Sequence, residues 1–258
     1  MGGFSLKILA INSSYRGERG YSAFLIDKVF TGAKSAGADC EVITLSKVKM
    51  KHCIACDRCQ TEESYLKCIY EDKDDVKEIF NKMAAADIII YGTPVYIFSM
   101  SGLLKIFFDR FYSTSNVSDL KISKSGMFFH HVTEKISGKP FVPLICCDNV
   151  ENETPENIIR YFQTFSKFMD APQVGLLLRQ AGGLVGHGKD SEKEKKYPKI
   201  VDIYNAFEQA GVELATLGYI KKFTQRRANQ KIVPSLPPVR FIKKYALDYA
   251  RKGMESEG

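Results

Sequence analysis

Short apolar runs alternate with amphipathic segments along the first 220 residues of the chain. The runs are nearly continuous in hydrophobicity and too short to be helices, which is typical of strands buried on both faces of a parallel sheet. We predict strands over Leu6–Ile11, Glu41–Leu45, Asp87–Tyr91, Phe141–Cys146 and Val174–Leu178.

The segments between these runs place apolar residues three and four positions apart, as on one face of a helix. The predicted helices are Tyr21–Ala36, Asp75–Ala85, Ser101–Tyr112, a segment that opens with "TPEN" at Thr154, and Tyr197–Leu217. Regular alternation of strands and helices predicts an α/β fold with a doubly wound, five-stranded parallel sheet. Such sheets bind ligands at the carboxyl ends of their strands, where the strand order reverses.

The composition is that of an ordinary globular protein, with 258 residues, 45% hydrophobic and 26% charged. No apolar run approaches the roughly 20 residues that span a bilayer. The opening "MGGFSLKILAINSS" lacks the basic flank and cleavage site of a signal peptide. We therefore expect a cytoplasmic protein without a membrane partner. We predict one domain over residues 1–220, followed by an extension over residues 221–258.

The net charge of +7 is concentrated in this extension, where Lys221–Lys252 holds ten Lys or Arg and one acid, Asp248. A basic tail can attract nucleic acid, anionic lipid or an anionic cofactor. No nucleic-acid motif accompanies the charge, so a solvated face or a subunit contact is the preferred interpretation. Phe241–Lys252 has the pattern of a terminal helix outside the core.

The loop after the first strand, Asn12–Ser22, runs directly into a predicted helix. It offers hydroxyls, positive charge and two glycines that let the backbone turn, from Ser13, Ser14, Arg16, Gly17, Arg19, Gly20 and Ser22. Exposed N–H groups at a helix start favour an anion, so a terminal phosphate is the expected occupant. A polar loop without function is the alternative.

The loop after the third strand, within Gly92–Arg110, combines a rigid proline with aromatic residues. Pro94 restricts the backbone, while Tyr96 and Phe98 provide ring surfaces beside backbone amides. A flat heteroaromatic ring binds to this combination. Together with the phosphate loop, the pattern predicts a mononucleotide lying across the strand ends.

Four of the seven cysteines, Cys53, Cys56, Cys59 and Cys68, lie within "KHCIACDRCQTEESYLKCIYEDKDD". In a reducing compartment such a group binds metal or does redox chemistry more often than it forms disulfides. Cys-x-x-Cys-x-x-Cys with a fourth cysteine nearby suits a [4Fe–4S] cluster, because successive thiolates can reach separate irons. Zinc usually takes two separated Cys-x-x-Cys pairs. Iron, zinc and cysteines without metal all remain open.

Four motifs belong together: Asn12-Ser13-Ser14 with Gly20-Tyr21-Ser22, Gly92-Thr93-Pro94-Val95-Tyr96, Lys105 with Asp109-Arg110, and the cysteine segment with Asp74-Asp75-Val76. In this combination the chain resembles the NAD(P)H-dependent FMN reductase family, and in particular its iron–sulfur flavoprotein branch. The resemblance covers about residues 6–220. It implies a flavodoxin-like fold, noncovalent FMN, NADPH or NADH as substrate, and a homodimer or homotetramer.

The resemblance also implies roles for individual residues. The FMN phosphate would be held by Ser13, Ser14, Arg16, Tyr21 and Ser22; the isoalloxazine would be lined by Pro94, Val95, Tyr96, Ile97 and Phe98, and covered near Cys147 and Asp148. The chain departs from the family at Asn12 and Ser14, where glycine and proline are usual, and at Tyr21-Ser22, which replaces Asn-Thr. Eight residues separate Cys59 from Cys68, more than in the iron–sulfur branch.

These observations favour an FMN-dependent NAD(P)H oxidoreductase that passes electrons from flavin to a [4Fe–4S] cluster and on to a small-molecule or protein acceptor. One alternative is an electron carrier that does not use nicotinamide, and another is a flavin-sensing regulator that binds nucleic acid. No side chain is expected to act as a catalytic acid or base. We expect Cys146 and Cys147 to pack in the core, with flavin contact as the alternative, and His130-His131 to lie in a loop.

Overall fold

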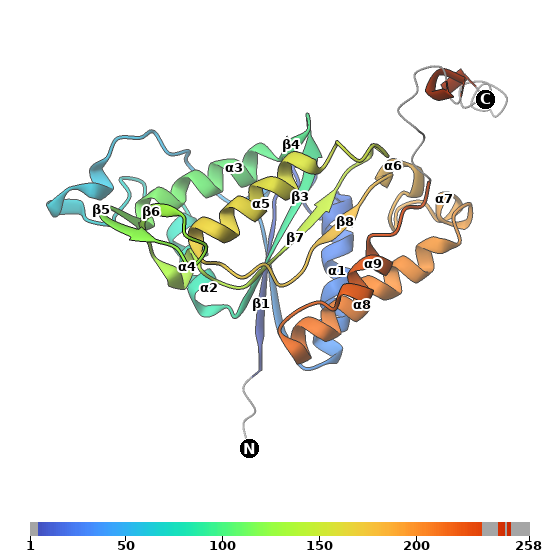
Figure 1. Cartoon of the computed structure of the whole chain (residues 1–258), viewed down its shortest axis with the longest axis horizontal. Helices are drawn as coiled ribbons and strands as arrows, with labels where there is room; N and C mark the ends of the chain where they lie inside the picture. The colour runs from blue at the N-terminus through green and yellow to red at the C-terminus, as the bar shows by residue number, and fades with distance from the viewer. Residues whose placement is uncertain (1–4, 234–241, 246, 249–258) are drawn as a thin grey trace.

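In the computed structural model, which describes residues 5–233, 242–245 and 247–248, a parallel sheet runs through the centre in the order β2-β1-β3-β7-β8 (Figure 1). Its strands are β1 (Lys7–Asn12), β2 (Asp39–Thr44), β3 (Ile88–Tyr96), β7 (Phe141–Cys146) and β8 (Leu177–Arg179). A short strand, β4 (Ser99–Met100), pairs antiparallel with the end of β3. The five predicted strands and the doubly wound α/β fold are confirmed. The strand order reverses on either side of β1.

The predicted helices are also present, with ends that differ by a few residues. The α-helices are α1 (Tyr21–Ser35), α2 (Val76–Ala85), α3 (Gly102–Asp109), α4 (Glu134–Ser137), α5 (Glu156–Met169), α6 (Gly182–Val185), α7 (Ser191–Lys195), α8 (Lys199–Leu217) and α9 (Lys222–Ala228). Single 3₁₀ turns are η1 (Gly17–Arg19), η2 (Leu45–Lys47), η3 (Arg58–Gln60), η4 (Glu62–Ser64) and η5 (Arg110–Thr114). None of the described helices is both long and apolar enough to cross a membrane.

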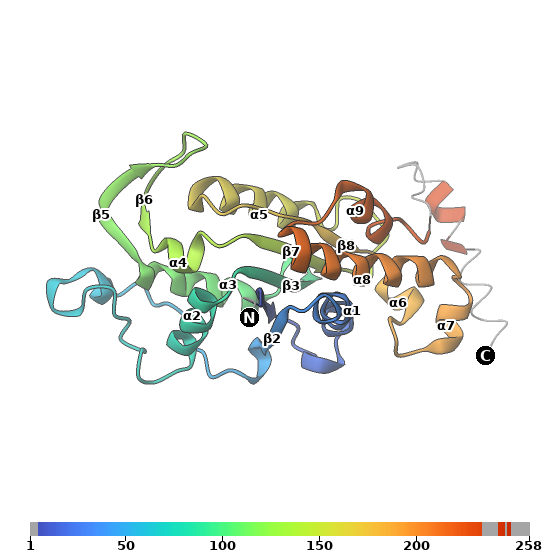
Figure 2. The same ribbon diagram turned by 90° about the horizontal axis from the view of Figure 1, so that it is seen from below.

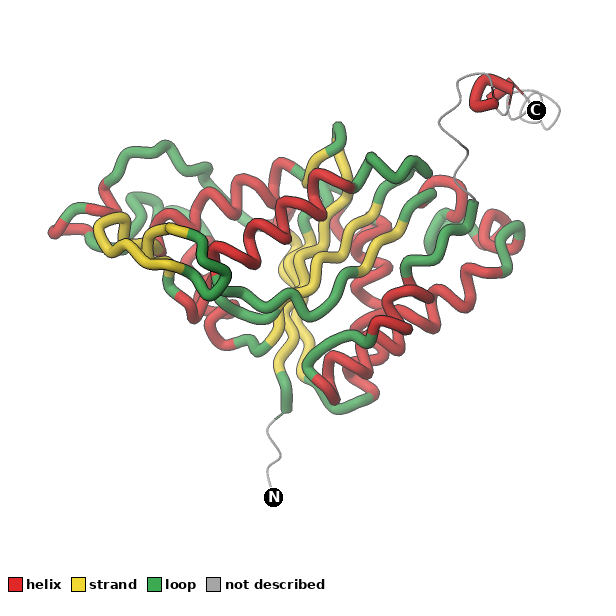
Figure 3. The backbone as a smooth tube through the Cα atoms, viewed as in Figure 1, coloured by secondary structure: helices red, strands yellow, loops and turns green. Residues whose placement is uncertain are grey.

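Alternate residues of each strand point into two separate apolar layers. Ile8 and Ala10 of β1 pack toward α1 and α8, whereas Leu9 and Ile11 pack toward α2, α3 and α5. Figure 1 and the tube view of Figure 3 show these helices on opposite sides of the sheet. Both faces of β1 are buried, which explains why its sequence is continuously apolar rather than alternating.

Helices α1 and α8 cross at two glycines. A Cβ atom on Gly211 would lie 1.9 Å from the carbonyl oxygen of Val29, and one on Gly32 would lie 1.8 Å from that of Glu208. No side chain fits at these distances, so the glycines allow the two backbones to touch. The contact fixes α1, whose first turn belongs to the candidate site.

A two-stranded hairpin, β5 (Ser115–Ile122) with β6 (Phe128–Val132), stands out from the body of the protein (Figure 2). His130 and His131 lie on β6, so the prediction of a loop there is wrong. The pairing has a bulge between Asn116 and Leu120, which interrupts the alternation that marks a strand in sequence.

The chain after residue 220 continues into α9, which packs on α8. Ala228 is fully buried in the same apolar layer as α8, and the Arg179 guanidinium donates to its carbonyl oxygen (2.9 Å). Of the predicted terminal helix Phe241–Lys252, residues 242–245 and 247–248 are helical, and the others lie outside the described residues.

Candidate functional site

The carboxyl ends of β1, β3 and β7 meet at one cleft, where the strand order reverses. Each strand contributes the loop that follows it. The cleft is lined by Ser14, Arg16, Gly20, Tyr21, Ser22, Pro94, Val95, Tyr96, Cys146, Cys147 and Asp148. Most of the predicted flavin residues are among them; Ser13, Ile97 and Phe98 are not, and Gly20 and Cys146 are additional. Loops that lie far apart in the sequence therefore form a single site.

The first loop is tied down by Asn12 and Ser13. The Asn12 side chain accepts from the Ser14 N–H (3.2 Å) and donates to the Gly17 carbonyl (3.3 Å). The Ser13 N–H and hydroxyl both donate to the Gly92 carbonyl of β3, at 2.8 Å and 2.9 Å. Ser13 thus fastens the loop to the sheet, while Ser14 faces the cleft.

Helix α1 begins directly after this loop, and its N-cap is unusual. Its N-cap residue is Gly20, which has no side chain to accept a hydrogen bond from the first amides. A Cβ atom there would lie 2.4 Å from the Ser14 hydroxyl oxygen, so glycine is required for space. Tyr21 and Ser22 of this first turn line the cleft, where the positive end of the helix dipole and Arg16 favour an anion.

The second loop is a tight turn that carries exposed apolar side chains. Ile97 and Phe98 adopt φ of 46° and 61°, which is uncommon for residues other than glycine and costs backbone energy in a β-branched one. Their exposed fractions are 89% and 58%. The Asn157 amide donates to the Phe98 carbonyl (3.2 Å) and braces the turn. Pro94, Val95 and Tyr96 line the cleft, and this strained turn exposes the apolar side chains of the two residues that follow them.

The third loop follows β7, and its two cysteines are buried. Burial raises the pKa of the Cys147 thiol to about 12 and also raises the pKa of Cys146. The Cys147 N–H donates to the Arg179 carbonyl (2.8 Å), which fixes the loop against β8. Both thiols stay protonated at neutral pH, so they contribute shape and contact rather than nucleophilic chemistry.

All four cysteines of the cysteine segment, residues 51–75, line a second, smaller cavity beside α3 and η5. Its walls are Cys53, Ile54, Cys56, Asp57, Cys59, Cys68, Ile69, Tyr70, Arg110, Tyr112 and Ser113. Figure 1 places this segment next to β5 and β6. The two cavities share no residue.

The backbone around the cysteines is strained. Ala55, Asp57 and Leu66 have φ of 50°, 54° and 56°, each a left-handed conformation that favours glycine. These turns bend the chain where Cys53, Cys56, Cys59 and Cys68 line the cavity. Strain of this kind persists where surrounding contacts or a ligand impose it.

Gln60 anchors the segment to the rest of the protein. Its amide nitrogen donates to the carbonyls of Tyr112 (3.3 Å) and Ser115 (2.8 Å), and its amide oxygen accepts from the Val117 N–H (3.2 Å). The same amide reaches the Cys59 sulfur at 3.6 Å. Burial raises the pKa of the Cys59 thiol, the Gln60 contact opposes this, and the neighbouring Cys68 and Cys53 raise it further.

The cysteines are free thiols, and within the described ranges no three His, Cys, Asp or Glu side chains already stand close enough to hold a metal ion. A cluster or zinc ion would therefore draw the segment inward on binding, as in sites whose ligands are ordered by the metal. The donor set of four thiols around one cavity suits either group.

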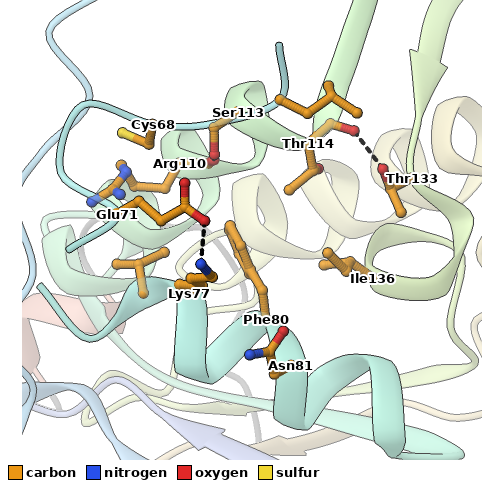
Figure 4. Close-up of a pocket in the computed structure, with 12 residues that line it drawn as sticks. Cys68, Glu71, Lys77, Phe80, Asn81, Arg110, Ser113, Thr114, Thr133 and Ile136 are labelled. Carbon is orange, nitrogen blue, oxygen red and sulfur yellow. Dashed lines mark hydrogen bonds and ion pairs between the residues drawn. The ribbon is translucent and has the colours of Figure 1, made fainter. Parts of the chain in front are cut away.

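A larger cavity of about 220 Å³ adjoins the cysteine cavity (Figure 4). Cys68, Arg110 and Ser113 line both. On the same side of the larger cavity as Arg110 and Cys68, Lys77 pairs with Glu71 at 2.5 Å, and Thr133 and Ile136 lie on the opposite side. The sequence pattern did not predict this cavity, because its walls come from α2, η5 and α4 as well as the cysteine segment.

Comparison with known protein families finds one whose sequence pattern includes these loops. The family described as NADPH-dependent FMN reductase matches residues 6–144. This chain belongs to that family. The match includes the first two loops of the flavin cleft and the whole cysteine segment. The third loop, after Cys146, lies beyond it.

Curated relatives add similarity to iron–sulfur flavoproteins. An iron–sulfur flavoprotein of Archaeoglobus fulgidus is 34% identical over 105 residues, covering 41% of this chain and 48% of that protein. One of Methanocaldococcus jannaschii is 36% identical over 105 residues, covering 41% of this chain and 51% of that protein. The chain thus spans about half the length of the curated relatives it matches.

Solved structures confirm the flavodoxin-like fold. An FMN-dependent NADH-azoreductase of Bacillus anthracis, solved with FMN, aligns with a TM-score of 0.56 at 15% identity, covering 82% of this chain and all of that one. An NAD(P)H:quinone oxidoreductase of Methanothermobacter marburgensis aligns with a TM-score of 0.51 at 18% identity, covering 81% of this chain and 97% of that one. At these identities the likeness concerns the fold alone.

Proposed function

We propose that the protein is an FMN-dependent oxidoreductase that takes electrons from NADPH or NADH. The observation that carries the proposal is the single cleft formed by the loops after β1, β3 and β7. A phosphate fits the uncapped start of α1, and a flat ring fits the apolar wall that follows β3. Family membership supports both assignments.

The cleft residues divide the binding of FMN between them. Ser14, Arg16, Tyr21 and Ser22 would hold the phosphate, while Pro94, Val95 and Tyr96 would contact the ring. Asp148 and Cys147 would close the third side. Ser13 keeps the phosphate loop in place through Gly92, and Ile97 and Phe98 are exposed in the turn that follows Tyr96.

Bound FMN would supply the hydride and electron chemistry, because the flavin ring accepts two electrons and releases them singly. The chain's own residues bind and orient the ring. The buried thiols beside the cleft remain protonated and do not compete as nucleophiles.

We further propose that Cys53, Cys56, Cys59 and Cys68 hold a [4Fe–4S] cluster that acts as a one-electron outlet toward a small-molecule or protein acceptor. Four thiols lining one cavity, with backbone strain around them, support this assignment. Zinc bound by the same thiols, or thiols without metal, are the competing possibilities.

The flavin is tested first, by adding FMN to flavin-free protein and following absorbance and fluorescence. Stoichiometric uptake is expected, followed by rapid bleaching on anaerobic mixing with NADPH or NADH. Absence of FMN uptake would refute the proposal. Bleaching by a reduced ferredoxin but by neither nicotinamide would make the protein an electron carrier instead.

The cluster is tested separately by metal and sulfide analysis after anaerobic purification and reconstitution. About four irons and four sulfides per chain are expected, with broad visible absorption from sulfur-to-iron charge transfer. Zinc, or no metal, would leave a plain flavin reductase.

A further inference from the structure

Arg110 stands in the wall of the cysteine cavity and is almost fully enclosed. Its side chain is 2% exposed, and it is the first residue of η5, just after α3. It lines both the cysteine cavity and the larger cavity beside it. Figure 4 shows its guanidinium beside the side chain of Cys68, which lines the same two cavities.

The guanidinium is held in one orientation by the chain around it. It forms an ion pair with the fully buried carboxylate of Asp74, and its Nη1 donates to the Lys51 carbonyl at 2.9 Å. The ring of Tyr70 lies 5.7 Å from its central carbon. These contacts fix both ends of the cysteine segment to Arg110.

One N–H donor of this guanidinium lacks a hydrogen-bond acceptor. The Arg110 Nε is buried and has no acceptor in the described part of the chain. A buried N–H without a partner costs about 1–3 kcal/mol, and more when the group is charged. Native structures seldom leave such groups unpaired unless a ligand or a function accounts for them.

The chemistry of the cavity indicates the acceptor. Four cysteines line the cysteine cavity. Of these four, Cys68 also lines the larger cavity, as Arg110 does. We infer that Arg110 is a positioning residue of the cysteine site, whose Nε–H donates a hydrogen bond to the thiolate of Cys68 when the four cysteines hold iron. This inference rests on the proposed cluster.

The hydrogen bond has a measurable consequence. Reduction adds one electron to the cluster, and a donor aimed at a ligand sulfur stabilises the more negative state. Hydrogen bonds to the sulfurs are among the factors that set the reduction potentials of such clusters. Arg110 would therefore raise the potential of this one.

The test is the variant Arg110→Lys, reconstituted anaerobically with iron, sulfide and FMN. Lysine keeps a positive charge for Asp74, but it cannot offer a second N–H in a fixed direction. Iron content should stay at the wild-type level. The one-electron equilibrium should shift about tenfold toward the oxidised cluster, which lowers the midpoint potential by about 59 mV.

Arg58→Lys is the matched control, because Arg58 lies between the same cysteines but is exposed. Its potential should equal that of the wild type. Equal potentials in Arg110→Lys and wild type, at equal iron content, would refute the role of Arg110 and leave the cluster standing. Loss of iron from Arg110→Lys alone would make the residue structural and also refute the inference. Wild-type protein without iron would refute the cluster itself.

A second measurement needs no folded Arg110 variant. Protein with Arg58→Lys, grown with ¹⁵N-arginine and reduced, should show a ¹⁵N hyperfine coupling in pulsed electron paramagnetic resonance. That coupling reports an arginine nitrogen in contact with the paramagnetic cluster, and the Arg58 background is removed. Absence of the coupling would overturn the inference.

Discussion

The flavin cleft and the cysteine cavity are built in opposite ways. Ser14 and Ser22 of the cleft are 2% and 1% exposed, and their loop is fastened to the ends of β1 and β3. In the cysteine segment Cys56 is exposed and Cys53 and Cys68 are partly so. Regular structure there is limited to the short turns η3 and η4.

This difference shows which of the two sites is ordered by packing of the core alone, without a bound ligand. The cleft inherits its geometry from two packed layers, because every strand that ends there is buried on both faces. The cysteine segment is held at a few side-chain anchors, chiefly Gln60 and the Arg110–Asp74 pair. We therefore expect the cleft to tolerate loss of the cysteine site, and the cysteine site to depend on its ligand for order.

The largest expected effect separates the two sites outright. Cys56→Ser should abolish iron binding while FMN still binds stoichiometrically, because the two cavities share no residue. Iron analysis and flavin absorbance measure both in one sample. Cys40→Ser, at a cysteine outside both cavities, should leave iron and FMN unchanged. Joint loss of FMN and iron in Cys56→Ser would show that the sites are coupled.

Breaking the Arg110–Asp74 ion pair, which anchors the cysteine segment, should lower the free energy of unfolding substantially. Asp74→Asn leaves the buried Arg110 charge without its partner, and removing one member of a buried pair costs about 3–5 kcal/mol. Urea unfolding measures the free-energy change. Asp109→Asn removes the exposed ion pair with Lys105 and should cost no more than about 0.5 kcal/mol. Equal losses in the two variants would contradict the assignment of Asp74 as the anchor.

A smaller change is expected from crowding the phosphate loop. Gly20→Ala places a methyl group 2.4 Å from the Ser14 oxygen, so the Ser14 side chain must move from its position in the cleft wall. FMN affinity should fall about tenfold, or about 1.4 kcal/mol, by fluorescence titration. Gly183→Ala is the matched control beside the same cleft, since its methyl would meet Asp148 at an ordinary 3.6 Å. Unaltered affinity in Gly20→Ala would remove Ser14 from the site.

The smallest expected effect is that the Cys147 thiol does not react with an alkylating reagent. The pKa of Cys147 is raised to about 12 by burial, so its thiol stays protonated at pH 8, and only the thiolate is alkylated. Iodoacetamide at pH 8 should leave Cys147 unmodified and modify the exposed Cys56 in iron-free protein. Peptide mass spectrometry reads both positions. Reconstitution with iron should protect Cys56, and modification of Cys147 would mean that the third loop opens.

Local sequence was sufficient for the elements that repeat a simple pattern. The strands of the parallel sheet are continuous apolar runs because both faces are buried, and α1 and α8 show one apolar stripe each. The cleft loops follow from the rule that ligands meet strand ends, and Ser14, Ser22, Pro94 and Tyr96, which the sequence predicts as flavin contacts, lie together in one cleft.

Other elements depended on contacts that no local pattern carries. The hairpin β5–β6 has polar residues and a bulge, so its alternation is broken, and it exists because the two segments pair with each other. Helix α3 ends at Asp109, three residues before the predicted end at Tyr112. The next residue, Arg110, pairs with Asp74, which lies 36 positions earlier in the chain.

Residue types and their spacing alone set the chemistry available at each site, because they supply the donors: hydroxyls and amides in one loop, four thiols in another. Tertiary structure decided how those donors are presented. Ser13 faces Gly92 instead of the cleft because β1 and β3 are hydrogen-bonded neighbours. Arg110 lines the cysteine cavity because its buried ion pair with Asp74 holds it there, and such long-range pairing is set only when the whole chain packs.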